Sequence, residues 1–473
     1  MKRFVIAVIS MVSLSAAAKE PLPTPADMPV LGEVEPFLFE HILESKDPDC
    51  SLANISEQPA FQALVKKHKL DLFGGPMVGC LTPNGASIWV RTAKEADVEI
   101  VVRNDVREVS CGKGRTSKQN DLTTVVAIEG LDPFSHYEYT VAVDGIVQDL
   151  AGPAVFRTAP KKGQKVAFDI AFGGGARYVH EHEGIWDTVA KHKPLAFLHL
   201  GDNLYIDDPE NRKRHNVYYY RRQLRPEFRR MVSGCGNYSI WDDHDFGVND
   251  SSGGPAIDSP AWKRPVWNVF KDNWVNPGYG GGEKQPGCWY SFSLGDVEFF
   301  MTDGRYYRDF KKGKTMLGPV QKAWLLKALS ESTATFKVIA SGTLWTELAD
   351  KGGKDSWWGV KEEREEIFSL IDQEKIGGVV LLSADRHRCD IYRIDRPNGY
   401  PLYEFESSKL TNNHTHPTKK SALFSYNEGN FFAKLRFDMT QADPTVTFSC
   451  ITLENKTIHE LEVKRSALEK QVE

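Results

Sequence analysis

The sequence predicts a multidomain α+β protein, in which a small all-β domain precedes a larger α/β domain. Short β-rich runs occupy residues 73–159, whereas apolar strands alternate with helical patterns over residues 160–473. The length of 473 residues exceeds what a single hydrophobic core usually supports. A hydrophobic content of 41% and an aromatic content of 11% are typical of globular proteins, so both regions are expected to fold.

The first 18 residues have the pattern of an export signal. Lys2 and Arg3 precede an apolar run from Phe4 to Leu14, and Ala16 to Ala18 are small residues suited to cleavage. We therefore expect a signal peptide over residues 1–18 and a secreted or periplasmic protein. No later run reaches about 18 apolar residues, so we expect no transmembrane segment.

Residues 19–72 are expected to be first extended and proline-rich, then helical. Residues 73–159 contain short alternating or β-branched runs separated by turn residues, which is typical of a β-sandwich. Within them, residues 130–145 (GLDPFSHYEYTVAVDG) resemble a turn and strand of a fibronectin type III-like module. Tyr137 and Tyr139 are expected in its core or at its corner.

Composition restricts the partners of the protein. The net charge is −5 and no run of Lys or Arg stands out, so nothing indicates nucleic-acid binding.

The seven cysteines form no CxxC pair, which excludes zinc-finger spacing. In an oxidising compartment one or two disulfides are expected. Cys80–Cys111 is the first candidate, because both residues lie in the β-rich region.

Polar side chains follow four predicted strands of the α/β domain, where each strand ends. Open α/β sheets bind ligands at the carboxyl ends of their strands, so the four endings are expected to converge. Together they indicate a metal-dependent catalytic centre. They are Gly201–Tyr205, Asp242–His244, Asp303–Arg305 and Asp385–His387.

The densest ending lies in residues 240–250 (IWDDHDFGVND), where Asp242, Asp243, His244 and Asp245 are consecutive. Carboxylates buried together repel one another and lose hydration, so a divalent or trivalent cation is expected nearby. The alternative is a solvated acidic turn.

The segments GDNLY, WDDHD, TDGRYYRD and ADRH, in this order after a β-sandwich, resemble the alkaline phosphatase D (PhoD-like) family of metallophosphatases. The segment GGPMVGCLTPNGASIWVRTA resembles the start of that family's N-terminal domain. The resemblance begins at about residue 73 and extends to the end of the chain. It implies a calcineurin-like metallophosphatase α/β sandwich over residues 160–473, preceded by the β-sandwich.

The resemblance also implies a set of metal ligands. Asp202 would bridge two metals, and Tyr205 would be a phenolate ligand suited to ferric iron. Asp243 would bind the second metal, and Asp385 and His387 would each bind one. For Tyr205 the alternative is an aromatic ring packed under the site. The metals implied are iron and calcium.

His244 and Arg305 are the predicted catalytic residues. By resemblance, His244 contacts the phosphate or protonates the leaving group. Arg305 and Arg308 follow a strand, and guanidinium groups suit phosphate oxygens, so one of them is expected to bind substrate. The alternative for each is a salt bridge to Asp303 or Asp309.

Gly175 departs from the family pattern. The family has a cysteine ligand to iron in the turn after the first strand, whereas residues 172–176 read FGGGA. The iron is therefore uncertain. His180 and His182 are candidate replacements for the missing ligand. The alternative is that both are exposed loop histidines without a role in metal binding.

Two further segments are candidate pocket walls. Residues 356–359 (SWWG), with Leu344 and Trp345, either wall an entrance or pack in the core. Residues 410–416 (LTNNHTH) follow a strand, and Asn412 within them is a predicted substrate contact.

We therefore predict an exported metal-dependent phosphoesterase that hydrolyses phosphomonoesters, phosphodiesters or both with a metal-activated water. One alternative is a phospholipase-type phosphodiesterase that acts on lipid head groups. Another is a catalytically weak binding scaffold, because Gly175 replaces a ligand. The expected partner is a small-molecule or lipid phosphate ester, and the expected state is a monomer.

Overall fold

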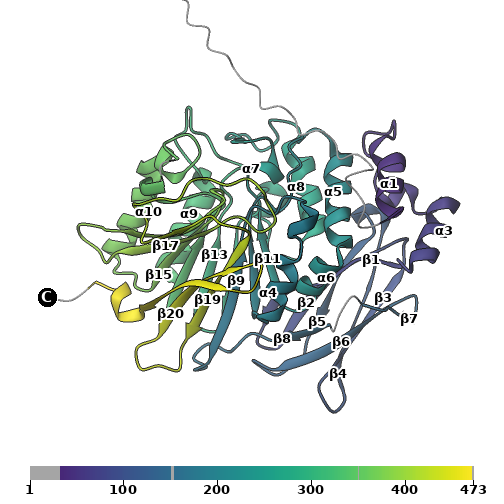
Figure 1. Cartoon of the computed structure of the whole chain (residues 1–473), viewed down its shortest axis with the longest axis horizontal. Coiled ribbons are helices and arrows are strands. Elements are labelled where there is room, and N and C mark those ends of the chain that lie inside the picture. Colours follow the sequence, from purple (N-terminus) through teal and green to yellow (C-terminus); the bar gives the residue numbers. More distant parts are fainter. Residues whose placement is uncertain (1–31, 151–153, 350, 471–473) are drawn as a thin grey trace, which may run out of the picture.

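The structure, a computed structural model, describes residues 32–150, 154–349 and 351–470 (Figure 1). The predicted signal peptide over residues 1–18 lies outside these ranges, as does the proline-rich stretch up to residue 31. None of the helices in the described ranges is long and apolar enough to cross a membrane.

Short helices open the described chain. They bury apolar residues such as Leu38, Ile42 and Phe61 against Val217 and Tyr220 of helix α5 (Arg212–Leu224). This small cluster attaches the N-terminal segment to the larger domain. The helices are α1 (Val34–Leu38), a π-helical turn (Phe39–Leu43), α2 (Leu52–Ile55) and α3 (Pro59–His68).

Two antiparallel sheets follow, with strand orders β1-β2-β5 and β4-β3-β6-β7, and β8 pairs with β6. In β3, Val98, Ile100 and Val102 are buried and alternate with more exposed residues, as expected for a strand with one face on a core. The strands are β1 (Leu72–Thr82), β2 (Gly85–Thr92), β3 (Asp97–Arg103), β4 (Glu108–Arg115), β5 (Thr123–Ile128), β6 (His136–Val143), β7 (Ile146–Val147) and β8 (Val155–Arg157).

The two tyrosines of β6 lie where the sequence predicts them. Both are buried. The Tyr137 hydroxyl accepts a hydrogen bond from the backbone N–H of Asp132 (2.8 Å), which ties the preceding turn to the strand. Tyr139 donates to the carbonyl of Ser233 (3.0 Å), in the larger domain. These residues therefore have structural roles at the corner and in the core.

The predicted disulfide Cys80–Cys111 is wrong. All seven cysteines, each within the described ranges, are free thiols. Cys80 lies on β1, where its thiol donates to the carbonyl of Val275 (3.3 Å), and Cys111 is exposed on β4 beside Glu99. The two strands belong to different sheets, so membership of one β-rich region did not bring the thiols together.

Two larger sheets form the centre of the molecule, with orders β11-β10-β9-β19-β20-β21 and β12-β13-β14-β15-β17-β16-β18. The first contains β9 (Ala167–Gly173), β10 (Ala196–Leu200), β11 (Gly236–Ile240), β19 (Phe431–Asp438), β20 (Thr445–Thr452) and β21 (Thr457–Lys464). The second contains β12 (Tyr290–Leu294), β13 (Val297–Met301), β14 (Phe336–Ala340), β15 (Val379–Ser383), β16 (Cys389–Ile394), β17 (Leu402–Ser407) and β18 (Phe424–Tyr426).

Helices lie on both sides of these sheets, with α9 and α10 on one side and α5, α6 and α8 on the other (Figure 1). Their bounds are α4 (Ile185–Lys191), α5 (Arg212–Leu224), α6 (Pro226–Val232), α7 (Asp243–Phe246), α8 (Lys263–Asn273), α9 (Gly318–Glu331) and α10 (Lys361–Gln373). The arrangement confirms the multidomain, sheet-rich α/β architecture.

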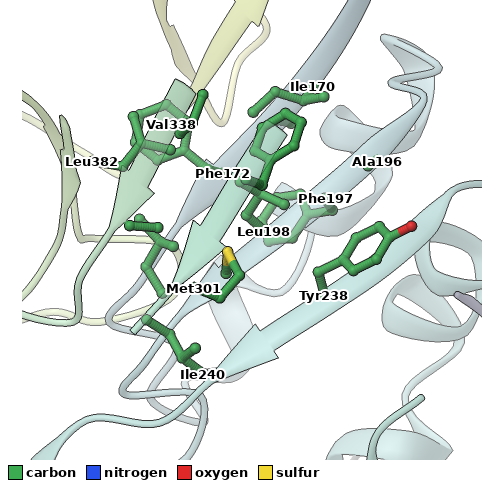
Figure 2. Close-up of a cluster of buried hydrophobic side chains, with 14 of the residues drawn as sticks. Ile170, Phe172, Ala196, Phe197, Leu198, Tyr238, Ile240, Met301, Val338 and Leu382 are labelled. Atoms are coloured by element: carbon green, nitrogen blue, oxygen red, sulfur yellow. The ribbon is translucent and has the colours of Figure 1, made fainter. Parts of the chain in front are cut away.

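A continuous apolar core lies between the two large sheets. Figure 2 shows Phe172 and Leu198 of the first sheet packed toward Met301 and Val338 of the second. Strands β9, β10 and β11 are parallel to one another, as are β13, β14, β15 and β17. Their carboxyl ends therefore share one edge of each sheet, which is where such folds place ligands.

Trp357 of the SWWG segment and the preceding Trp345 belong to this core. Trp345 and Trp357 are fully buried, and their rings stack with centroids 4.1 Å apart. The indole nitrogens donate to the Leu382 carbonyl (3.2 Å) and to the Ser341 hydroxyl (3.0 Å). Of the two alternatives for these residues, the structure therefore supports core packing rather than a pocket wall.

His199, inside β10, predicts acid sensitivity of the fold. Its ring lies between Phe197 and Trp274, and burial lowers the pKa of His199 to about 3. Below about pH 6.5 the unfolded chain binds a proton here that the folded protein excludes, so stability falls as the pH falls. At pH 5 the loss from this residue is about 2 kcal/mol.

Urea unfolding of the protein and of His199→Gln at pH 7 and pH 5 tests this expectation. The variant should lose about 2 kcal/mol less stability between the two pH values. His459→Gln, on the outer strand β21, should behave like the unsubstituted protein. Equal losses for His199→Gln and the unsubstituted protein would contradict the assignment.

Candidate metal centre

The loops that carry the predicted ligands have strained backbones. Asp202, Asp385 and His387 all have positive φ, at 51°, 79° and 51°. Non-glycine residues in this region are uncommon, and such strain is concentrated at functional sites. Just before Asp202, a Cβ added at Gly201 would lie 2.5 Å from the Cβ of Asp242. Glycine is therefore needed for the loops after β10 and β11 to approach each other.

These loops surround a pocket of about 430 Å³. It brings together six of the predicted site residues, namely Asp202, Tyr205, His244, Asp385, His387 and Asn412. A larger cavity of about 940 Å³ lies at the opposite ends of β9 and β10, and no predicted site residue lines it. We therefore take the smaller pocket as the functional site.

The hydroxyl group of Tyr205 is the centre of a hydrogen-bond network in this pocket. It donates to Asp202 Oδ2 (3.1 Å) and accepts from Asn412 Nδ2 (2.6 Å). His387 Nε2 lies 3.1 Å away. The Tyr205 ring stacks on His244 with centroids 4.1 Å apart. The ring thus packs against the site while its oxygen lies among the predicted ligands.

Several buried side-chain oxygen and nitrogen atoms that could bind a metal have no hydrogen-bond partner within the described chain. They include Asp202 Oδ1, Asp243 Oδ1 and His387 Nδ1. A buried polar atom without a partner is costly, and a bound cation would satisfy such atoms. The residues present therefore fit a metal site.

Potential ligand atoms lie within 4.8 Å of one another in three groups. Two groups share Asp243 and are rich in carboxylate oxygens, which suit hard cations such as Ca²⁺. The third consists of histidines alone. The groups are Asp202–Asp243–His244, Asp243–Asp250–Asp355 and His387–His414–His416.

Burial makes a charged Asp202 unfavourable in the protein alone. Burial, together with the nearby carboxylates of Asp243 and Asp242, raises the pKa of Asp202 well above its usual range. A cation bound between Asp202 and Asp243 would stabilise the ionised carboxylate. The electrostatics of the site thus agree with metal binding.

His244 is oriented by Asp207, a residue that the sequence reasoning did not single out. His244 Nδ1 lies 2.6 Å from Asp207 Oδ1, and the histidine lines the pocket. Although the ring is buried, Asp243, Asp202 and Asp207 raise the pKa of His244 well above its usual range. The three carboxylates thus favour the protonated form of the ring, which can donate a proton. The sequence signal that could have indicated Asp207 is the pair of carboxylates, Asp207 and Asp208, at the end of GDNLYIDD.

Asp242 and Asp245 are buried, so the solvated acidic turn is excluded. Asp245 accepts hydrogen bonds from the backbone N–H groups of Asn203 (3.1 Å), Leu204 (2.8 Å) and Asp242 (3.2 Å). It therefore ties the loop after β10 to the loop after β11. Asp242 accepts from Arg305 instead.

Arg305 and Arg308, predicted to contact substrate, do not line this pocket. Both side chains are fully buried. Arg305 Nε donates to Asp242 Oδ1 (2.5 Å), and its terminal nitrogens donate to both oxygens of Asp355 (2.7 and 3.0 Å). Arg308 also pairs with Asp355. The geometry favours buried salt bridges, the alternative for these residues, with Asp355 as the shared partner rather than Asp303 or Asp309.

Other cationic side chains line the pocket instead. They are Arg177, Lys351, Lys354 and Arg386. Lys351 Nζ pairs with Asp385 and lies 2.5 Å from Asp355. Sequence reasoning gave these residues no role. Lys351 and Lys354 lie in an irregular loop without a strand signal, whereas Arg177 and Arg386 follow β9 and β15. The four side chains supply the positive charge that an anionic ligand needs.

Neither His180 nor His182 lies where it could replace the cysteine ligand that is missing at Gly175. His180 Nδ1 lies 3.0 Å from a guanidinium nitrogen of Arg225, and His182 Nδ1 lies 3.0 Å from the Thr411 carbonyl. Neither lines the pocket. Gly175 itself adjoins the site, since a Cβ there would lie 3.5 Å from His387 Cδ2.

Comparison with known proteins places the chain among phosphatases. A model of the PhoD-like phosphatase family matches residues 170–469, and a domain of unknown function (DUF7800) matches residues 69–154. Alkaline phosphatase D of Bacillus subtilis (strain 168) is 24% identical over an alignment of 326 residues, which covers 58% of this chain and 55% of that protein. The match thus spans little more than half of the relative's length.

Solved structures show the same fold. A structure of PhoD superposes with a TM-score of 0.68 at 16% identity, covering 82% of this chain and 92% of the other. The purple acid phosphatase PPD1 from yellow lupin (Lupinus luteus) seeds superposes with a TM-score of 0.59 at 12% identity, covering 83% of this chain and 75% of the other. Because the family model covers more than half of the chain, the protein belongs to the PhoD-like phosphatase family.

Proposed function

We propose that the protein is an exported metal-dependent phosphoesterase that hydrolyses phosphomonoesters, phosphodiesters or both. Family membership implies a hydrolase of phosphate esters. The observation that carries the proposal is the convergence of Asp202, Tyr205 and His387, all buried, in a pocket that cationic side chains also line. Export is proposed from the pattern of residues 1–18.

The proposed metal ligands are Asp202, Tyr205, Asp243, Asp385 and His387. Two or more bound cations would polarise the phosphoryl group and lower the pKa of an attacking water. Asp202 is the proposed bridging residue, since one of its oxygens accepts from Tyr205 and the other has no hydrogen-bond partner. Iron and calcium are the cations suggested by the resemblance, with iron uncertain because of Gly175.

The chain's own polar groups would complete the chemistry. We assign to His244 the role of proton donor to the leaving oxygen, because the ring lines the pocket and neighbouring carboxylates raise its pKa. Lys354, Arg386 and Asn412 lie where they would contact phosphate oxygens. These residues replace Arg305 and Arg308 as the proposed substrate contacts.

Asp207→Asn tests the role of His244 as a proton donor. Asparagine cannot balance the charge of the imidazolium, so kcat should fall by about 10²-fold, within the range usual for general acids, while KM changes little. Because Asp207 has a φ of 52°, which asparagine also tolerates, the fold should survive. The acid-dependent limb of the pH–rate profile should shift. An unchanged kcat and profile would remove Asp207 from its positioning role.

For the rest of the chain we keep the domain boundaries 73–159 and 160–473, a fibronectin type III-like assignment of the β-domain and a monomeric state. The two β-sheets of residues 72–157 and the buried Tyr137 support the β-sandwich interpretation. Sedimentation equilibrium of the mature protein would test whether it is monomeric.

Parallel assays on one preparation test the proposed function. The substrates are an aryl phosphomonoester, a soluble bis-aryl phosphodiester and a phospholipid in mixed micelles, with metal content measured on the same sample. Hydrolysis of either soluble ester with bound metal supports the proposal. Turnover of the phospholipid alone would indicate a phospholipase, and a metal-free protein without hydrolysis would indicate a binding scaffold.

A further inference from the structure

Three histidines from two separate segments meet at one end of the pocket. His387 follows β15, whereas His414 and His416 lie in the loop between β17 and β18. One potential ligand nitrogen of each ring lies within 4.8 Å of the others. This group is separate from the carboxylate groups around Asp243.

The ring spacing agrees with a shared cation. The ring centroids are 5.1 Å apart for His387 and His414, 5.7 Å for His387 and His416, and 4.8 Å for His414 and His416. Imidazoles bound to one tetrahedral Zn²⁺ at about 2.0–2.1 Å have centroids about 5 Å apart. The three distances lie on either side of that value, so small side-chain rotations would suffice for binding.

Hydrogen bonds between asparagine side chains and the backbone hold the loop in place without using the imidazoles. Asn412 Oδ1 accepts from the His414 N–H (2.9 Å), and Asn427 Nδ2 donates to the His416 carbonyl (2.9 Å). Asn430 Nδ2 donates to the Asn412 carbonyl (2.8 Å). Within the described chain, the rings of His414 and His416 make no hydrogen bond, so their nitrogens are available to a ligand.

A second observation comes from His387. Its Nδ1 is buried and has no hydrogen-bond partner among the described residues. Buried imidazole nitrogens are normally paired, and a cation is a partner that a neutral ring accepts.

We propose that His387, His414 and His416 together bind one divalent cation, with Zn²⁺ the class that three imidazole nitrogens favour. The inference rests on the proposed function in one respect only, the assignment of His387 to a cation. It adds His414 and His416 as ligands and makes this end of the pocket rich in nitrogen donors. The Tyr205 oxygen lies 3.1 Å from His387 Nε2, the other ring nitrogen.

The experiment uses untagged, chelator-treated protein titrated with Zn²⁺ alone. Zinc content is measured after dialysis, and zinc coordination is measured by X-ray absorption. The test variant is His414→Ala/His416→Ala, and the matched control is Asn413→Ala, an exposed position in the same loop. Asp202→Asn separates the histidine group from the carboxylate group.

The protein and Asn413→Ala should bind one zinc that has about three nitrogen ligands at about 2.0–2.1 Å. The double variant should lose that signature and bind this zinc at least about 100-fold more weakly, a larger loss than one supporting residue usually causes. Asp202→Asn should keep it. Unchanged nitrogen coordination and affinity in the double variant would overturn the inference, and ester hydrolysis would then still support the proposed function. Three-nitrogen zinc in a protein that hydrolyses no phosphate ester would uphold the inference and refute that function.

Discussion

Asp202→Asn is expected to reduce hydrolysis of phosphate esters by at least about 10³-fold, which corresponds to about 4 kcal/mol of transition-state stabilisation. The side chain is buried, one oxygen accepts from Tyr205 and the other has no hydrogen-bond partner. Asparagine has the same shape and tolerates the φ of 51° at this position, so the substitution removes charge without imposing new backbone strain. The measurement is kcat/KM with the ester that the protein prefers.

The control for this prediction is Asp443→Asn, in the loop between β19 and β20, which should retain full activity. Thermal unfolding of both variants shows whether the fold is kept. Removing a buried carboxylate beside Asp243 relieves repulsion, so the metal-free Asp202→Asn protein should be at least as stable as its parent. A folded Asp202→Asn protein with full activity would refute the two-metal assignment.

Arg305→Ala is expected to lower the free energy of unfolding by roughly 3–5 kcal/mol, because it leaves buried carboxylates without their partner. The guanidinium contacts Asp242 at 2.5 Å and Asp355 at 2.7 and 3.0 Å, and all of these side chains are buried. A substrate-contacting arginine would instead raise KM while leaving stability almost unchanged. Denaturant unfolding combined with steady-state kinetics distinguishes the two roles.

Arg115→Ala is the matched control for Arg305→Ala. Arg115 pairs with Asp97 at 2.7 Å, but both side chains are largely exposed, so its loss should change the stability very little. If Arg305→Ala raises KM and has no more effect on stability than Arg115→Ala, the structural role of Arg305 is wrong and the arginine binds substrate.

The parts of the site that the sequence predicts follow buried strands. Asp202 comes directly after β10, Asp243 after β11, and Asp385 with His387 after β15. An apolar run followed by carboxylate and histidine is visible in sequence, and parallel pairing brings such endings to one edge. The same reasoning predicts a large α/β domain built around buried sheets, because many of its strands are apolar runs, whereas the α/β sandwich is what the resemblance to the PhoD-like family implies.

The features that the sequence does not predict depend on contacts between segments that are distant along the chain. Arg305 is directed away from the pocket by Asp355, which lies 50 residues further along the chain in an irregular loop. Whether an arginine after a strand faces substrate or a buried carboxylate is not encoded in its neighbours. The predicted disulfide between Cys80 and Cys111 is wrong for a similar reason, since strand pairing places the two residues on different sheets. Lys351 and His416 likewise reach the pocket from loops.

The most direct test of the central claim is the rate of phosphate-ester hydrolysis before and after chelation, with the metal content measured on the same samples. The proposed function predicts that the metal-free protein falls to the rate of Asp202→Asn and recovers when divalent cations are returned. Metal-free protein that hydrolyses the ester at the original rate would contradict it.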